Sequence, residues 1–333
     1  MDALSDVLRA VRLTGAVFFD VKASEPWVAE TPAGATIVRN IFPGADHLMS
    51  YHVVTSGSCW ACPLDGEPVH LTAGDVVVFP HGDAHAMCSA PGMRDAPDMG
   101  RFRPPNNGQL PFTLSVGAPQ DHPAHLVCGF LGCDAGPFNP LLAALPKVIR
   151  VGNQQGGAIG AFVQFALAES QHPRIGGECV LGRLSELMFV DVVRSYLETL
   201  PADRTGWLAG LRDPFVGRAL TALHRDPAHD WTLESLAREV GLSRSALAER
   251  FVQFVGQPPM QYLGNWRMQL AASLLMSGTE GVAEIAGRVG YESEAAFSRA
   301  FKKNVGTPPS QWRKHREQPA EGHPAPRRQL QSG

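Results

Sequence analysis

The sequence predicts a multidomain α+β protein: an N-terminal antiparallel β-barrel followed by a pair of helices, then a C-terminal all-α domain with two helix-turn-helix units. Three observations predict this fold class. Short apolar runs interrupted by glycine and proline fill the first part of the chain, as in strands joined by turns. Residues 140–200 change to helical apolar spacing. The last hundred or so residues contain an internal repeat of two helical units.

Length and composition set the first limits. The 333 residues are enough for roughly two domains, each with its own core. Charged residues are spread over the first twenty positions, so no secretory signal fits there. Nowhere do about eighteen apolar residues run together, as a membrane span requires. We therefore expect a cytoplasmic protein without membrane contact, whose six cysteines are thiols, metal ligands or redox switches.

The predicted strands have the regular short spacing that is typical of an antiparallel barrel or jelly roll. They are Val17–Val21, Thr36–Phe42, Met49–Thr55, Cys59–Cys62, Val69–Leu71, Val76–Phe79, His85–Cys88, Phe112–Val116 and His125–Phe130.

Helices follow the barrel. A helical region begins at Pro140, and two amphipathic helices are predicted at Gly160–Ser170 and Glu178–Leu200. The second has an apolar stripe that fits either a core or a dimer face, made of Leu181, Leu184, Leu187, Met188, Val192 and Tyr196. The predicted domains are 1–200, a linker at 201–211, the helical domain at 212–316 and a disordered tail at 317–333.

The repeat is the most specific signal in the chain. Leu236–Gly241 returns as Ile285–Gly290, and further on Gly256 matches Gly306 and Pro258-Pro259 matches Pro308-Pro309. Chance similarity between amphipathic helices does not place glycine turns and Pro-Pro pairs in register. In each copy a glycine stops a first helix, and a serine, Ser243 or Ser293, caps a second. Two helices joined by a short turn form a helix-turn-helix unit, whose second helix enters the major groove of DNA.

Helical geometry indicates which side chains of the second helices face outward. Arg299 can make a bidentate contact with guanine, Glu249 can accept a hydrogen bond from cytosine, and an outward alanine can touch a thymine methyl. Arg244, Lys302 and Lys303 are better placed for contacts with phosphates. The alternative for each of these residues is that it lies on a solvated helix face and contacts no DNA. The candidate DNA-binding residues are Arg244, Ser245, Ala248, Glu249, Glu294, Ala295, Arg299, Lys302 and Lys303.

Two further features fit this interpretation. Residues 211–318 carry a net charge of +3, against −7 for residues 1–210, so the second part is the better partner for a polyanion. Met260–Met276 is a proline-free helical stretch of roughly 25 Å, long enough to place two recognition helices in successive major grooves.

Residues 212–316 closely resemble the DNA-binding domain of the AraC/XylS family, through Ile285–Phe301 and Gly306–Arg313. The resemblance implies seven helices and binding to double-stranded promoter DNA by the second helix of each unit. RNA polymerase is a candidate for a further partner. The family often has large polar or aromatic residues on the first reading helix. Here those positions hold Ser245, Ala248 and Glu249, so we expect the second unit to read bases more stringently than the first.

The segment Gly74–His85 resembles the second motif of the cupin family: glycine, five residues, Pro80-x-Gly82, two residues, then His85. In cupins the matching histidine faces the barrel interior and often binds metal. The first cupin motif is not recognisable around His47–Gly57. The resemblance is to the cupin sensor domains of AraC-family regulators, over about residues 1–200, and such domains pair through their helices, which implies a homodimer.

A metal or redox site is a hypothesis for this domain. His52, His85 and Cys128 form a possible set for zinc or another divalent metal, with Cys88, Cys133, His47 or water as a fourth ligand. The alternative is that each is an isolated core residue. Cys128 and Cys133 would form a thiol switch if a tight turn joined them. Cys59 and Cys62 are a weaker pair, because residues three apart on a flat strand face opposite sides.

Two functions follow from these observations. The first is a sequence-specific DNA-binding regulator, without catalytic residues, whose cupin domain senses a small molecule, metal or oxidant. The alternative is a metal-dependent cupin enzyme with a DNA-binding appendage. The missing first cupin motif favours the regulator.

Overall fold

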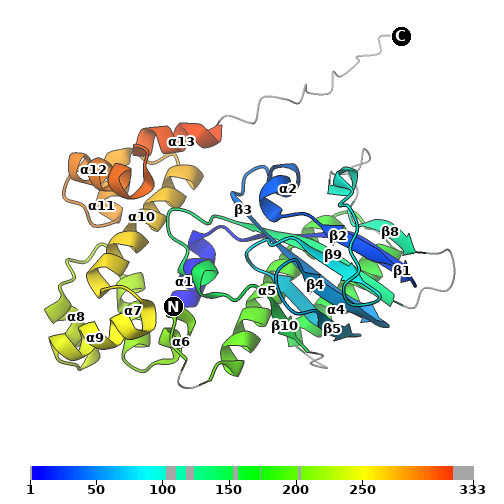
Figure 1. Ribbon diagram of the computed structural model, residues 1–333. Coiled ribbons are helices and arrows are strands. Elements are labelled where there is room, and N and C mark those ends of the chain that lie inside the picture. The colour runs from blue at the N-terminus through cyan, green and yellow to red at the C-terminus, as the bar shows by residue number, and fades with distance from the viewer. Residues whose placement is uncertain are drawn as a thin grey trace, which may run out of the picture.

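The computed structural model describes residues 2–102, 110–117, 124–152, 157–172, 174–201 and 204–317. These form an N-terminal part with two β-sheets and a C-terminal part made of helices, side by side in Figure 1. The predicted disordered tail lies outside the described residues from 318 onward. No helix within the described ranges is long and apolar enough to cross a membrane.

Ten strands build two sheets that face each other. The six-stranded sheet has the order β10-β6-β3-β9-β1-β8, and the four-stranded sheet has the order β2-β7-β4-β5. The strands are β1 (Thr14–Ser24), β2 (Val28–Thr31), β3 (His47–Ser56), β4 (Ser58–Pro63), β5 (Val69–Thr72), β6 (Val76–Phe79), β7 (His85–Cys88), β8 (Phe112–Gly117), β9 (Ala124–Cys133) and β10 (Ile149–Val151).

The prediction of an antiparallel barrel is corrected in two respects. The strands form two separate sheets and not a closed barrel, because the four-stranded sheet pairs only within itself. All strand pairs are antiparallel except β1 and β8, which run parallel and pair from Phe19 with Phe112 to Ser24 with Gly117.

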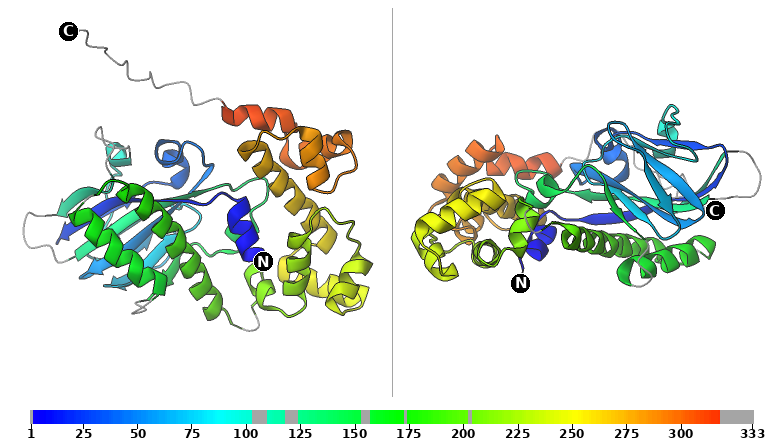
Figure 2. Two further views of the ribbon diagram at one scale, coloured as in Figure 1. Left: turned by 180° about the vertical axis from the view of Figure 1, so that it is seen from behind. Right: turned by 60° about the horizontal axis from the view of Figure 1, so that its bottom comes forward.

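Helices cover the outer face of the six-stranded sheet, so the N-terminal part has three layers (Figure 2). The covering helices are α4 (Gly157–Gln171) and α5 (Gly177–Thr199), near the predicted boundaries. This explains the continuous apolar run of β6. Val76 and Val78 belong to the core shared with the helices, whereas Val77 and Phe79 belong to the core between the sheets.

One predicted strand is wrong. Thr36–Phe42 was expected to be extended because it is rich in β-branched residues, but the structure has a helix, α2 (Gly34–Ile41). The helix buries Gly34, Ile37 and Val38, which share one face at helical spacing. Tertiary packing therefore overrides the local preference. A Cβ at Gly34 would lie 2.6 Å from the Leu48 carbonyl oxygen, which shows how closely α2 approaches β3.

The helical part begins earlier than predicted. Residues 201–211 were predicted to be a linker, yet Trp207–Arg212 forms α6, with Trp207 and Leu208 buried. Seven further helices follow, as the family resemblance implied: α7 (Val216–Arg225), α8 (Leu233–Val240), α9 (Arg244–Val255), α10 (Pro259–Ser277), α11 (Val282–Arg288), α12 (Glu294–Val305) and α13 (Pro309–Glu317).

The N-terminal helix α1 (Ala3–Ala10) and the short helix α3 (Pro140–Ala144) lie between the two parts (Figure 1). Val7 of α1 is fully buried, and it belongs to one apolar core that extends from the six-stranded sheet into α6–α10. The two parts are therefore packed together along a shared core and not joined only by chain connectivity.

Candidate DNA-binding surface and sensor core

The first helix pair, α8 and α9, is fixed by its caps. Thr232 caps α8 in a capping box with Ser235, and Gly241 ends it with a φ of 76° that suits glycine. Ser243 then accepts a hydrogen bond from the Ala246 N–H and begins α9. Leu247 and Phe251 are fully buried, which sets the face that α9 turns outward.

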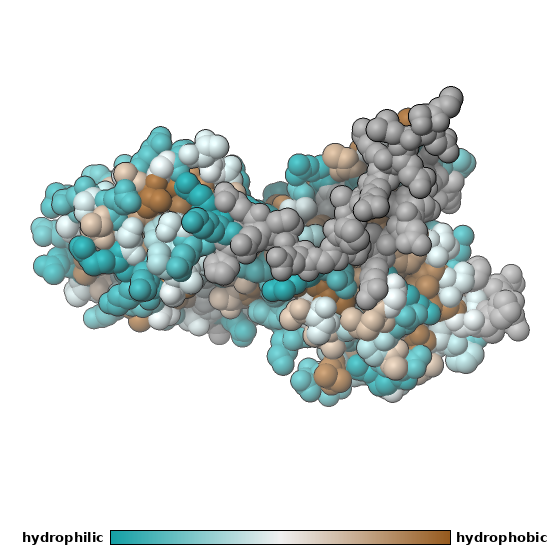
Figure 3. All heavy atoms as spheres, turned by 90° about the horizontal axis from the view of Figure 1, so that it is seen from above, coloured by the Kyte–Doolittle hydropathy of each residue, from teal (hydrophilic) through white to brown (hydrophobic). Residues whose placement is uncertain are grey.

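The second helix pair, α11 and α12, repeats this construction. Gly290 has a φ of 79° in the turn, and Ser293 accepts from the Ala296 N–H to cap α12. Phe297 and Phe301 are fully buried, in the positions of Leu247 and Phe251. Seen from above, the helical part is mostly hydrophilic with isolated apolar residues (Figure 3).

The structure places the predicted DNA-binding side chains on the outer faces of α9 and α12. Ala248 is half-buried and the other eight are exposed. Within the described residues, no ion pair involves Arg244, Arg299, Lys302 or Lys303, so these cations are available to a polyanion. The outward faces agree with the sequence prediction, whereas contact of each residue with DNA stays a prediction.

Helix α10 connects the two pairs and contributes to the cores of both. Its first half packs Tyr262 and Trp266 into the core of the first pair, and its second half packs Ala271 and Leu275 into the core of the second. The helix has 19 residues, or roughly 28 Å. Figure 1 shows α9 and α12 near its two ends, on the side away from the sheets.

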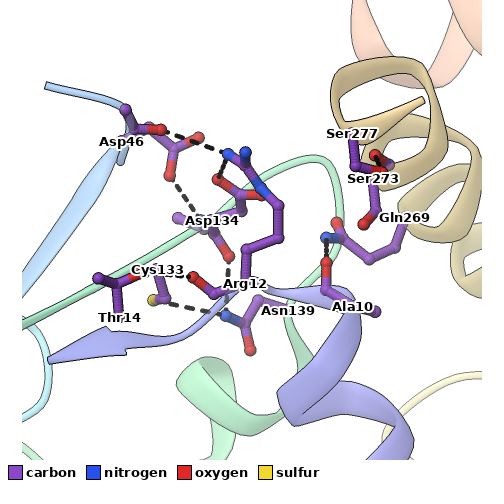
Figure 4. Close-up of polar contacts among 12 residues, drawn as sticks. Ala10, Arg12, Thr14, Asp46, Cys133, Asp134, Asn139, Gln269, Ser273 and Ser277 are labelled. Atoms are coloured by element: carbon purple, nitrogen blue, oxygen red, sulfur yellow. Dashed lines mark hydrogen bonds and ion pairs between the residues drawn. The ribbon is translucent and has the colours of Figure 1, made fainter. Parts of the chain in front are cut away.

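A buried glutamine joins α10 to the N-terminal part (Figure 4). Gln269 is fully buried; its Oε1 accepts from the Phe138 N–H at 3.0 Å, and its Nε2 donates to the Ala10 carbonyl at 3.2 Å. We call this set the Gln269 clamp. Beside it, Arg12 makes a bidentate pair with Asp134 at 2.6 and 2.8 Å. Sequence reasoning missed the clamp, although a glutamine on an apolar helix was a visible signal.

The space between the two sheets is filled mainly by aromatic side chains. Phe18, Phe19, Phe112 and Phe130 pack edge to face, with ring centroids 4.9–6.3 Å apart. Such a filled interior gives the sensor domain a dense core.

Two histidines lie in that interior. The Nε2 atoms of His52 and His85 are 2.8 Å apart, and the His85 ring stacks on Phe79. His85 Nδ1 lies 2.8 Å from the Asp83 carbonyl, which fixes it as a donor, so His85 Nε2 accepts from His52. Burial lowers the pKa of His85 to about 4, and burial with the neighbouring His85 lowers the pKa of His52 well below its usual value. The pair is therefore neutral near pH 7.

The predicted metal set is only partly assembled. His52 and His85 meet, and Cys128 lies opposite His52 across the β3–β9 pair. Within the described ranges, however, no three His, Cys, Asp or Glu side chains are grouped as a metal site. The proposed fourth ligands are elsewhere: His47 contacts the Pro80 carbonyl, and Cys88 lies against Cys62. As arranged, these residues bring two ligands together but do not form a complete zinc site within the described ranges.

In each predicted redox pair, the two cysteines face opposite sides of the strand that contains them. Cys128 and Cys133 belong to the continuous strand β9, without the tight turn that was predicted, and an odd spacing places them on opposite faces. Cys59 and Cys62 likewise face opposite sides of β4. Burial raises the pKa of both Cys128 and Cys133, so neither is poised as a thiolate.

Comparisons with known proteins agree with this architecture. Residues 2–198 match a cupin family, and residues 236–315 match a helix-turn-helix domain family. An AraC-like transcription regulator of Streptomyces antibioticus is 35% identical over 325 residues, covering 95% of this chain and 99% of that protein. The chain belongs to the AraC family of transcription regulators. The regulator AlkR of Acinetobacter baylyi is 28% identical, over 94% of this chain and 99% of its own length.

Among solved structures, the DNA-binding domain of AdpA in complex with a target DNA is 30% identical over 31% of this chain and 92% of that chain, with a TM-score of 0.29. Family membership confirms the predicted combination of an N-terminal cupin domain with a helix-turn-helix domain, and the protein is a DNA-binding transcription regulator.

Proposed function

We propose that this AraC-family regulator reads two adjacent promoter elements with one chain, using α9 and α12 as the recognition helices of two helix-turn-helix units. The observation that carries the proposal is the repeated geometry: two serine-capped helices with exposed polar faces stand near the two ends of α10. A rod of roughly 28 Å is close to the 34 Å of one duplex turn. Such an arrangement suits successive major grooves on one side of DNA.

The two helix-turn-helix units present different side chains to DNA. α12 presents Arg299, Lys302 and Lys303, whereas α9 presents Arg244 and Glu249 beside small residues. Arginine gives the commonest bidentate contact with guanine, while a glutamate accepts only from cytosine and repels phosphate. We therefore expect the second unit to bind its DNA element more tightly than the first.

Promoter binding is tested by mobility shifts on the DNA upstream of the gene. Arg299→Ala is expected to lose about 1–3 kcal/mol, or roughly 5- to 150-fold in affinity. Arg39→Ala is the matched control, because Arg39 is an exposed arginine on α2, outside both helix-turn-helix units and the proposed dimer face, and its removal changes the net charge equally. Equal loss in both variants, or no loss with Arg299→Ala, would count against α12 as a recognition helix.

The N-terminal domain supplies the regulatory input in this proposal, in response to a small molecule, a metal or an oxidant. The Gln269 clamp supports it, because a change in sensor packing at α1 or Phe138 reaches α10 directly. A cupin enzyme is the competing function, and turnover of small molecules by the full chain would favour it. Metal analysis of the purified wild type and of His85→Ala tests the zinc prediction: stoichiometric zinc lost in the variant supports it, and its absence from both rejects it.

A second copy of this chain is the proposed partner of the outer helical face. The predicted stripe on α5 is divided: Leu181, Met188 and Val192 are buried, but Leu187 is 51% exposed. Val180, two helical turns earlier, is also exposed, as is Phe165 of α4. These apolar side chains support a homodimer formed through α4 and α5. A cytoplasmic location and a contact with RNA polymerase are further parts of the proposal.

A further inference from the structure

Two buried cysteines meet on the outer face of the four-stranded sheet. The sulfur atoms of Cys62 on β4 and Cys88 on β7 are 3.3 Å apart. Because Trp60 pairs with Cys88 and Cys62 pairs with Ala86, the cysteines occupy diagonal positions on neighbouring antiparallel strands. Cys62 is 3% exposed and Cys88 is fully buried, so neither packs as an ordinary surface thiol.

This thiol pair is separate from the sensor core described above. Alternation along β4 sends Cys59 and Ala61 into the core between the sheets, and Cys62 to the other side. The pair belongs to a small apolar cluster with Ala86, bordered by Val28, Trp60 and Met93. It therefore lies on the side of the molecule opposite α4 and α5 (Figure 2).

A short segment, residues 89–95, follows Cys88 and places Met93 against the pair. Ser89 begins the segment and contacts the Met93 sulfur at 3.4 Å. At its other end Arg94 makes a bidentate pair with Glu30 at 2.6 and 2.9 Å, and the Asp95 N–H donates to the same carboxylate. Val28, Trp60 and Met93 pack against the thiols and are themselves only half-buried, so the pair lies close to the protein surface.

We propose that Cys62 and Cys88 are a site of reversible oxidation, at which a peroxide converts the two thiols into one intramolecular disulfide. Attack of one sulfur on the peroxide breaks the O–O bond, gives a sulfenic acid and releases one water. The second thiol then displaces the sulfenic oxygen, which leaves as a second water, and the S–S bond forms. The two thiols lose two electrons and two protons in total, and the peroxide is reduced.

The geometry assigns different roles to the two sulfurs. Cys62 keeps some solvent exposure and is the one that an oxidant reaches first. Burial, followed by the hydrogen bond with Cys62, raises the pKa of Cys88 to about 12, so Cys88 is not the sulfur that attacks the oxidant. Its sulfur lies 3.3 Å from that of Cys62, and this proximity assigns it the second, resolving step. The inference rests on the regulatory role proposed for the N-terminal domain and names a peroxide as its signal; because neither step requires DNA, its failure is distinguishable from a failure of promoter binding.

Formation of the Cys62–Cys88 disulfide changes the distance between β4 and β7. A disulfide holds its sulfurs about 2.05 Å apart, so the pair must approach by roughly 1.3 Å. Diagonal partners in a flat sheet are about 7–8 Å apart, which is more than the roughly 7 Å that a disulfide spans without backbone movement. Oxidation therefore draws β4 and β7 together and repacks Trp60 and Met93, which is a structural change that a regulatory domain can transmit.

The experiment is peptide mapping of the reduced full-length protein after treatment with hydrogen peroxide. Free thiols are alkylated, the protein is digested, and disulfide-linked peptides are identified by mass spectrometry. We expect a Cys62–Cys88 link that forms within the monomer and is reversed by dithiothreitol. Cys179 is exposed and serves as an internal reporter that the oxidant has acted.

Variants complete the test. Cys62→Ser and Cys88→Ser should each abolish the link, whereas Cys133→Ser, which changes a buried thiol on β9, should keep it. The wild-type map does not depend on how well any variant folds. Modification of Cys179 while Cys62 and Cys88 both remain alkylatable overturns the proposal, and so does a link from Cys62 to any other cysteine.

Discussion

Replacing Gln269 by alanine should weaken the attachment of the DNA-binding domain to the sensor domain. The change removes both hydrogen bonds of the Gln269 clamp and leaves the Ala10 carbonyl and the Phe138 N–H without partners in a buried junction. Each buried unsatisfied backbone group costs about 1–3 kcal/mol, so we expect a loss of about 3 kcal/mol in the free energy of unfolding. Urea unfolding followed by tryptophan fluorescence measures this loss, since both parts of the chain contain tryptophans.

The control is Gln261→Ala on the same helix. Gln261 is exposed, so its substitution has the same effect on helix propensity without disturbing a buried contact. We expect it to change stability by less than about 0.5 kcal/mol. If Gln269→Ala is as mild as Gln261→Ala, the clamp does not hold the domains together, and the route from sensor to α10 must be sought elsewhere.

Three other predictions concern charge, pH and assembly. Lys302→Ala should weaken binding to all DNA sequences alike and reduce the salt slope of log K by about 0.9, whereas an unchanged slope would remove Lys302 from the phosphate contacts. Because the folded state holds the pKa of His85 near 4 while the unfolded chain protonates near 6.5, the contribution of His85 to stability is full above about pH 6.5 and falls by about 3 kcal/mol towards pH 4. His85→Asn should make the pH profile shallower in urea titrations, while the buried His52 and His224, whose pKa values are also lowered, keep part of the slope; an equally steep profile would refute the assignment. Leu187→Arg should shift the protein to monomers in sedimentation experiments, because it places an unpaired charge in the proposed apolar interface; an unchanged dimer would reject the α4–α5 face.

The sequence predicted best where spacing and backbone requirements are strict. Gly241 and Gly290, both with positive φ, and the two capping serines are sufficient to locate both helix pairs from the sequence. The cupin motif likewise located β6 and β7 to the residue, because proline, glycine and a buried valine run leave few alternatives.

The predictions from sequence were wrong where tertiary packing determines the local secondary structure. The β-branched run at 36–38 favours a strand in isolation, but burial of Ile37 and Val38 against the sheet makes it α2. The turn expected between Cys128 and Cys133 does not form because β9 pairs continuously with β1 and β3. The meeting of Cys62 with Cys88 depends on strand register, which spacing along one chain does not determine.

A methylation-interference footprint on the promoter DNA tests the central claim most directly, because that claim is that α9 and α12 enter successive major grooves. The account predicts two patches of essential guanines for each bound protomer, on one face of the duplex and about 10 base pairs apart. It also predicts that Arg299→Ala erases one patch and spares the other. A single patch for each protomer, or two patches that disappear together, would contradict it.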